Sequence, residues 1–215
     1  MTDIYRAHGC VFNGLNDVVI RNDREAPFEP ETMEFINTAL SHRDGCFIDV
    51  GASTGWYSCI MAKRGHDVIA FEPNRNAMKR LRENMNRNRL FIHCYEAAAS
   101  NDKGRGILHH NKNELLTSGG SLNGVHCANP GAYHVDKMRI DDAVNIPVAV
   151  IKIDVEGYEL RVLQGAEKTI MKNKPRMILE ANSQADESIL ATWLIDHYYS
   201  YCRIDGRNLA CVPCA

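Results

Sequence analysis

Long apolar runs are missing from this sequence. No stretch approaches the roughly 20 consecutive apolar residues that a helix needs to cross a bilayer. The first ten residues also lack the charged region followed by an apolar core that marks a signal peptide. We therefore expect a cytoplasmic protein with no membrane partner, whose eight cysteines are reduced.

An excess of charge of either sign is missing as well. The chain has 25 lysine and arginine residues against 27 aspartate and glutamate residues, a formal net charge of -2. This balance argues against nucleic acid or an anionic membrane as a partner. We expect the basic stretch Asn74–Asn88 to be a helix whose charges face solvent.

The cysteine spacing of a zinc ribbon or finger is also absent. Cys211 and Cys214 form the only close pair, and one pair supplies half a zinc site. We expect no metal there. The sequence contains no internal repeat, and 215 residues suit one α/β domain. Residues 1–43 are expected to form an N-terminal segment and helix that pack on a core of residues 44–215.

What the sequence does contain is an alternation of strand-like and helix-like segments. Short, almost wholly apolar runs indicate parallel strands that are buried on both faces. The alternation predicts an α/β fold: a Rossmann-like doubly wound, mostly parallel sheet with a C-terminal antiparallel hairpin strand. The expected strands are Cys46–Val50, Asp67–Phe71, Leu90–Tyr95, Val148–Asp154, Arg176–Glu180 and the hairpin Tyr199–Ile204 with Asn208–Pro213, and the expected helices are Trp56–Arg64, Asn74–Asn88, Tyr158–Lys172, Glu187–His197 and one that begins at Pro30.

A long glycine-rich segment interrupts the alternation from about Ser100 to Asn145. Its composition predicts a hairpin plus loop rather than a helix. Within it, Ser118–Gly124 reads SGGSLNG, and we expect a lid there because glycine permits hinge motion.

A glycine turn follows the first expected strand and precedes a helix. It has the form D-x-G-x-x-x-G, with Asp49, Gly51 and Gly55, and the glycines let backbone approach a ligand. Glu72 ends the second expected strand, where a carboxylate can bond both hydroxyls of a ribose. A dinucleotide usually takes G-x-G-x-x-G, and Asp49 would repel its pyrophosphate but attract the ammonium of a methionine group. The turn therefore favours S-adenosylmethionine over NAD.

Several further motifs accompany this turn: Phe47–Ala52, Phe71–Pro73, the spaced Leu81, Asn84 and Asn88, Ile151–Glu159, Val162–Ala166 and Pro175–Glu180. Together they resemble FkbM-type methyltransferases over about residues 44–182, although that family usually has Asn-Ile in place of Ser53-Thr54. The resemblance implies a class I methyltransferase fold, S-adenosylmethionine as methyl donor and, most often, O-methylation. The cofactor-binding residues that we expect are Asp49, Gly51, Ala52, Ser53, Gly55, Glu72, Glu96, Ala97 and Asp154.

The acceptor should bind at the carboxyl ends of the strands, near the point where the strand order reverses. Asp154 ends the fourth expected strand, and Lys152 and Glu156 share its side of that strand. A lysine in a buried strand requires a charge partner, for which Glu180 is a neighbour. These four are our candidate catalytic residues: Asp154 or Glu156 would orient or deprotonate the acceptor. The alternative is a structural ion-pair network that fixes the strand ends.

A metal at this end is a further alternative. Asp154, Glu180 and Asn182 could hold Mg²⁺ because they are hard oxygen ligands at adjacent strand ends. The resemblance does not require a metal, and we expect none.

The sequence thus predicts an enzyme that methylates a hydroxyl of a small-molecule acceptor, such as a sugar or a natural-product intermediate. The alternatives are N- or O-methylation of a peptide or another polymer, and a non-catalytic module that keeps the cofactor fold. The stretch Glu180–Ser183 contains no lysine, which argues against an RNA 2′-hydroxyl as acceptor. Specificity must then come from residues 1–43 and 100–147.

Overall fold

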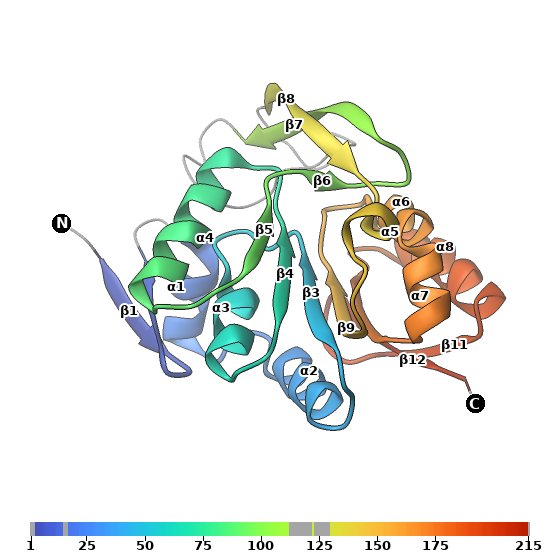
Figure 1. The fold of residues 1–215 in the computed structure, drawn as a ribbon, viewed down its shortest axis with the longest axis horizontal. Helices are drawn as coiled ribbons and strands as arrows, with labels where there is room; N and C mark the ends of the chain where they lie inside the picture. Colours follow the sequence, from blue (N-terminus) through green and yellow to red (C-terminus); the bar gives the residue numbers. More distant parts are fainter. Residues whose placement is uncertain (1–2, 15–16, 112–121, 123–129, 215) are drawn as a thin grey trace.

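A seven-stranded sheet lies at the centre of the protein in the computed structural model, which describes residues 3–14, 17–111, 122 and 130–214. The strand order is β11-β12-β10-β9-β3-β4-β5 (Figure 1). The five strands from β10 to β5 are parallel, and β12 runs antiparallel to β10. The sheet consists of β3 (Cys46–Val50), β4 (Val68–Phe71), β5 (His93–Tyr95), β9 (Val148–Ile153), β10 (Arg176–Glu180), β11 (Tyr199–Arg203) and β12 (Asn208–Pro213).

This order confirms the predicted doubly wound sheet with its antiparallel C-terminal strand. Successive side chains of each buried strand point to opposite faces of the sheet and are apolar on both. Helices therefore cover both faces. From β3, Phe47 packs toward one face, while Ile48 and Val50 pack toward the other. The first face is covered by α2 (Pro30–Ser41), α3 (Trp56–Lys63) and α4 (Arg75–Arg87), and the second by α5 (Ile140–Ala143), α6 (Glu159–Gly165), α7 (Glu167–Asn173) and α8 (Gln184–Asp196).

The N-terminal region contains three elements that the sequence did not predict. β1 (Ile4–Ala7) and β2 (Cys10–Asn13) form a hairpin, and α1 (Val18–Glu25) follows them. Asn88 at the end of α4 holds β2, because its side chain accepts from the Val11 amide at 2.7 Å and donates to the Val11 carbonyl at 2.8 Å.

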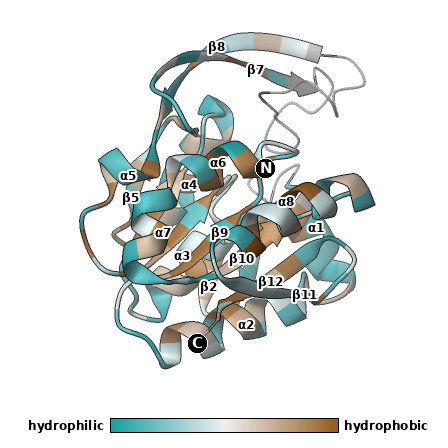
Figure 2. Ribbon diagram, turned by 90° about the vertical axis from the view of Figure 1, so that its right-hand side faces the viewer, coloured by the Kyte–Doolittle hydropathy of each residue, from teal (hydrophilic) through white to brown (hydrophobic). Residues whose placement is uncertain are grey.

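A second, smaller sheet lies beyond one end of the central sheet (Figure 2). It contains β6 (Ala98–Ala99), β7 (Gly104–Asn111) and β8 (Pro130–Met138), in the order β6-β8-β7. The antiparallel pairing of β7 with β8 confirms the predicted hairpin, whereas β6 was not predicted. The lid expected at 118–124 lies outside the described residues apart from Leu122, and it stays a prediction.

Three predictions of element bounds are wrong. The helix expected at Glu187–His197 begins three residues earlier, since α8 starts at Gln184. The strand expected at Leu90–Tyr95 is only β5, since the Leu90 amide still bonds the Met85 carbonyl at 3.0 Å and closes α4. The helix expected at Tyr158–Lys172 is divided into α6 and α7. The break adjoins Gly165, where a β-carbon would lie 1.9 Å from the Ser100 carbonyl oxygen.

Within the described residues, no helix combines the length and the apolar character that a bilayer-spanning segment requires.

Candidate active site

A cavity of about 400 Å³ opens at the carboxyl ends of β3, β4 and β9. Five of the twelve candidate residues that the sequence singled out line it. Gly51, Ser53 and Glu72 line one part, and Asp154 and Glu156 line another. The two parts correspond to the expected cofactor end and the expected reacting end.

The glycine turn brings the β3 and β9 strand ends into direct contact. Gly51 has a φ of +78°, and a β-carbon there would lie 1.8 Å from the carbonyl oxygen of Asp154. Any larger residue at 51 would therefore push the two strand ends apart. Gly55, at φ +86°, is the N-cap of α3, and a β-carbon there would lie 2.8 Å from the Leu81 side chain. Ala52 is buried under the turn and does not line the cavity.

Glu72 lies at the end of β4 and is only 7% exposed. Each of its carboxylate oxygens accepts one backbone N–H, from Ser53 at 2.8 Å and from Asn74 at 2.7 Å. Burial raises the pKa of Glu72 to about 7. Each oxygen of an ionised carboxylate retains a further lone pair, so the group can accept the two hydroxyls of a ribose while the turn holds it in place.

Asp49 lies under the turn rather than in the cavity lining. Its carboxylate is 1% exposed and accepts the Ser58 hydroxyl at 2.5 Å. Burial raises its pKa, whereas the charge of Lys152 on the neighbouring strand lowers it. The structure thus places Asp49 outside the cavity lining, and contact with a methionine ammonium stays a prediction.

The predicted cofactor residues after β5 lie just outside the cavity lining. Glu96 forms an ion pair with Arg82 at 2.8 Å, and Ala97 is buried. The wall at this point is made by the next two residues, Ala98 and Ala99 of β6. The run of alanines after the third strand was the signal that could have identified them.

Lys152 and Asp154 form an ion pair at the end of β9, with 2.7 Å between Nζ and Oδ2. The Lys152 side chain is 3% exposed, and its ammonium lies 5.0 Å from the centre of the Tyr57 ring. Burial lowers the pKa of Lys152, but the charges of Asp154 and Glu29 outweigh this effect and raise it. Burial in turn raises the pKa of Asp154, whereas Lys152 lowers it below its usual value. Both groups are therefore charged at neutral pH.

Glu180 lies beside this pair and is 1% exposed. Its Oε1 accepts from Arg207 at 3.2 Å, while among the described residues no group donates to Oε2. Burial and the charges of Asp154 and Glu156 raise the pKa of Glu180 to about 10. Asp154, Glu156 and Glu180, here called the acidic triad, offer carboxylate oxygens that all lie within 4.8 Å of one another. Asn182 is exposed and does not line the cavity.

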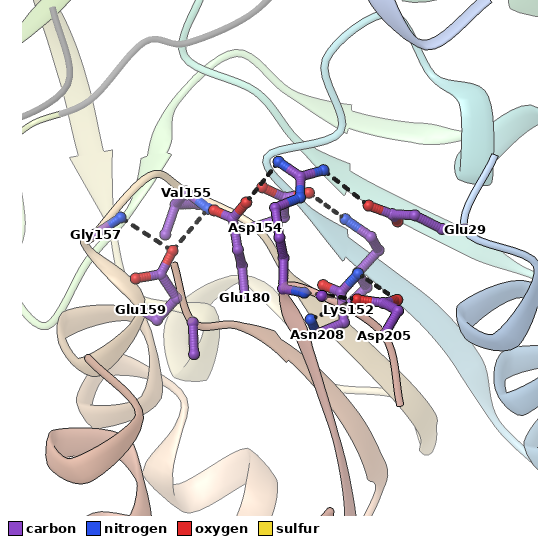
Figure 3. Close-up of polar contacts among 12 residues, drawn as sticks. Glu29, Lys152, Asp154, Val155, Gly157, Glu159, Glu180, Asp205 and Asn208 are labelled. Carbon is purple, nitrogen blue, oxygen red and sulfur yellow. Dashed lines mark hydrogen bonds and ion pairs between the residues drawn. The ribbon is translucent and has the colours of Figure 1, made fainter. Parts of the chain in front are cut away.

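Arg207 and Glu29 complete the polar network, and no pattern in the sequence indicated either residue. Arg207 lies in the turn between β11 and β12 and pairs with Glu29 at 2.9 Å as well as with Glu180. Glu29 precedes α2 and accepts the Tyr57 hydroxyl at 2.7 Å. Figure 3 shows Glu29, Lys152, Asp154 and Glu180 grouped around one point. Arg207 and Glu29 are 178 positions apart in the sequence, and only the folded structure brings them together.

The remaining wall comes from the two regions that the sequence assigned to specificity. Val19 and Asn22 of α1 and Phe28 line it from the N-terminal region, and Leu108 of β7 and Leu122 line it from the long segment. These residues come from parts of the chain outside the central sheet, which is where we expected acceptor recognition.

Solved structures of methyltransferases share this architecture. An FkbM methyltransferase from Methylobacillus flagellatus superposes with a TM-score of 0.58 at 19% identity, over 80% of this chain and 45% of that one. A Pyrococcus abyssi tRNA (uracil-54, C5)-methyltransferase in complex with S-adenosyl-L-homocysteine superposes with a TM-score of 0.56 at 11% identity, over 98% of this chain and 44% of that one. The sheet order and the glycine turn at its centre define the fold class as that of the class I S-adenosylmethionine-dependent methyltransferases.

Residues 49–201 match the methyltransferase FkbM domain, and the chain belongs to that family. Its cofactor is therefore S-adenosylmethionine. A curated relative, the hexuronic acid methyltransferase AglP of Haloferax volcanii, is 30% identical over 130 residues, which are 58% of this chain and 51% of the relative. The chain thus spans about half the length of each of these three relatives.

Proposed function

We propose that the protein transfers the methyl group of S-adenosylmethionine to a hydroxyl of a sugar. The observation that carries this proposal is the carboxylate-rich end of the cavity, where Asp154 and Glu156 line the wall next to the glycine turn. Ionised carboxylates accept hydrogen bonds from hydroxyls. The similarity to a hexuronic acid methyltransferase supports a sugar as the acceptor.

The reaction requires mainly alignment. The acceptor oxygen attacks the methyl carbon as the bond from carbon to sulfur breaks, and S-adenosylhomocysteine leaves; such in-line transfer gains most from proximity. The hydroxyl must also lose its proton, which a nearby base accelerates. We assign the orientation of the hydroxyl to Asp154 and Glu156, and the positioning of Asp154 to Lys152 and Glu180.

Glu72 and the backbone of Gly51 and Ser53 would hold the cofactor in this scheme. We propose that Glu72 binds the ribose and that the turn lies against the methionine part. Ala98 and Ala99 would contact the adenine end, because they line the cavity just after β5, which lies on the opposite side of β4 from β9 in the strand order. The alternatives, a peptide or another polymer as acceptor and a module without turnover, are outcomes of the following test.

The experiment is a radiolabelled methyl-transfer assay with uronic acids, neutral sugars, peptides and RNA as acceptors. We expect label in a sugar, and we expect Asp154→Asn to lower turnover by roughly 10²–10⁴ while the affinity for S-adenosylhomocysteine changes little. Label in peptide or RNA alone would contradict the sugar assignment. A turnover of Asp154→Asn within a few-fold of wild type would show Asp154 to be structural.

A further inference from the structure

The loop that follows β9 has an unusual backbone conformation. Glu156 has a positive φ of +56°, although it is not a glycine, and Gly157 after it has a φ of +91°. Residues with side chains rarely adopt this left-handed conformation, which persists only where the surrounding structure holds it. Glu156 lines the cavity, and so do its neighbours Val155 and Tyr158. The conformation of this loop therefore shapes the reacting end of the cavity.

Glu159 contacts this loop through the loop's backbone. The residue is only 4% exposed, and its Oε1 accepts from the Val155 amide at 3.1 Å and from the Gly157 amide at 3.2 Å (Figure 3). These two amides lie on either side of Glu156 in the chain. A single buried oxygen therefore fixes the backbone both before and after the residue with the left-handed conformation.

Capping of helix α6 does not explain these contacts. Glu159 is the first residue of α6, and Tyr158 is its N-cap. A capping glutamate bonds the backbone amide of the N-cap residue, whereas Glu159 reaches past Tyr158 to two amides of the loop. Burial and the charge of Asp154 both raise the pKa of Glu159, to about 7, so this position does not favour a negative charge. The contacts therefore fix the loop rather than the helix.

We propose that Glu159 is a positioning residue, which holds the loop in the conformation that places Glu156 in the cavity wall. Asp154, at the start of the loop, is held separately, because its amide donates to the Val50 carbonyl at 3.0 Å. Loss of the contacts to Oε1 should therefore release Glu156 and leave Asp154 and the glycine turn in place. The two amides require an acceptor oxygen, which a neutral side-chain amide also supplies.

The consequence for the reaction rests on the proposed function, in which Glu156 helps to orient the hydroxyl of the sugar. Methyl transfer depends on alignment, and a displacement of about 1 Å can cost about a hundredfold in rate. A loop that is no longer held should therefore lower kcat and raise the KM for the sugar. Binding of S-adenosylhomocysteine, which we assign to Glu72 and the glycine turn, should change little.

Two substitutions of nearly equal length test the role of the acceptor oxygen. Glu159→Gln keeps an oxygen that can accept both amides, whereas Glu159→Met removes it. The first measurement is amide exchange at Val155 and Gly157 by nuclear magnetic resonance, on the full chain without a sugar. Exchange should be at least about tenfold faster in Glu159→Met than in wild type, and within about threefold of wild type in Glu159→Gln.

The second measurement is turnover with the sugar that the acceptor screen labels. Glu159→Met should lower kcat by roughly 10–100-fold and raise the KM for the sugar, with a Kd for S-adenosylhomocysteine within about threefold of wild type. Glu159→Gln should keep kcat within about threefold of wild type. The matched control is Asn173→Ala, which removes a side-chain acceptor from the Val148 amide at the opposite end of β9. It should speed exchange at Val148 and leave kcat unchanged.

Unchanged exchange or wild-type turnover in Glu159→Met would overturn the proposal, and so would equal losses in Glu159→Met and Glu159→Gln. Circular dichroism checks that the variants fold. If Glu159→Met does not fold, Gly157→Ala decides, because a side chain at φ +91° disfavours the same loop conformation while Glu159 is intact. Its kcat should fall, and an unchanged kcat would overturn the proposal. Faster exchange in Glu159→Met with no sugar methylated would support the hold on the loop and refute the proposed function alone.

Discussion

At the residue scale, Glu72 combines burial with a fixed orientation. The backbone N–H groups of Ser53 and Asn74 hold its two oxygens, so little side-chain entropy is lost when a ribose binds. Its raised pKa, about 7, follows from the same burial. One carboxylate thus links the geometry of the turn to the affinity for the cofactor.

We predict that Glu72→Gln weakens binding of S-adenosylhomocysteine about tenfold, the equivalent of about 1.5 kcal/mol for one charged hydrogen bond. In the wild type, affinity should rise with pH up to about 7 and then level off, because the ionised form accepts both hydroxyls while the protonated form must lose its proton first. The variant should lack this pH dependence. Calorimetric titration between pH 5.5 and 8 measures both effects.

Glu96→Gln is the matched control for this prediction. Glu96 was also expected in the cofactor site, but it pairs with Arg82 and does not line the cavity. Its variant should bind as wild type does. Equal losses in the two variants would refute the assignment of the ribose to Glu72.

At the element scale, α4 supports the N-terminal hairpin as well as the sheet. The side chain of Asn88 pairs with both backbone groups of Val11, and Asn84 accepts from the Asn13 amide at 2.9 Å while donating to the Thr54 carbonyl. Thr54 in turn donates to Asp17 at the start of α1. The wall contributed by α1 is therefore connected by hydrogen bonds to the cofactor turn.

Asn88→Ala should lower the free energy of unfolding by about 1–3 kcal/mol, because partly buried backbone groups of Val11 lose their partners. Urea denaturation monitored by circular dichroism measures the change. Asn86→Ala, at an exposed position of the same helix, should change stability by less than about 0.5 kcal/mol. Equal effects of the two substitutions would mean that the hydrogen bonds between Asn88 and Val11 do not stabilise the fold.

At the scale of the whole molecule, the turn between β11 and β12 meets the start of α2. Asp205 accepts from Thr32 at 2.9 Å and from the backbone amides of Arg207 and Asn208. Burial raises the pKa of Asp205, but these hydrogen bonds outweigh burial and lower it. The contact positions Arg207 against Glu29 and so completes the cavity wall from two distant parts of the chain.

We predict that Asp205→Ala lowers the free energy of unfolding by about 2 kcal/mol at pH 7. A lowered pKa in the folded protein means that the stabilisation is present above the unfolded pKa of about 4 and is lost as the pH falls below it. The difference from wild type should therefore shrink by pH 3. Asp196→Ala, at the exposed end of α8, is the control and should be neutral or slightly stabilising. A pH-independent difference would contradict this role for the ionised carboxylate.

Local patterns predicted the central sheet and three residues of the cavity lining, Gly51, Ser53 and Glu72. Each parallel strand appears in the sequence as an apolar run. The glycine turn and Glu72 directly follow two of these runs, so the ends of the predicted strands also predict where these residues lie at the edge of the sheet. The N-terminal hairpin and α1 escaped prediction because they are short and partly polar, and β6 because it is only two residues long. Their stability comes from contacts such as that between Asn88 and Val11, which join residues 77 positions apart.

The sequence by itself determined the fold, the cofactor and the strand ends that carry Asp154 and Glu180, because these depend on periodicity and on residues close together in the chain. Only the tertiary structure decided that Arg207 and Glu29 meet at the cavity, that Glu156 rather than Asn182 joins Asp154 and Glu180, and that α1 and β7 form the remaining wall. The physical reason is that charge pairing and burial act through space. Positions that are distant in the sequence leave no local pattern from which such pairing could be predicted.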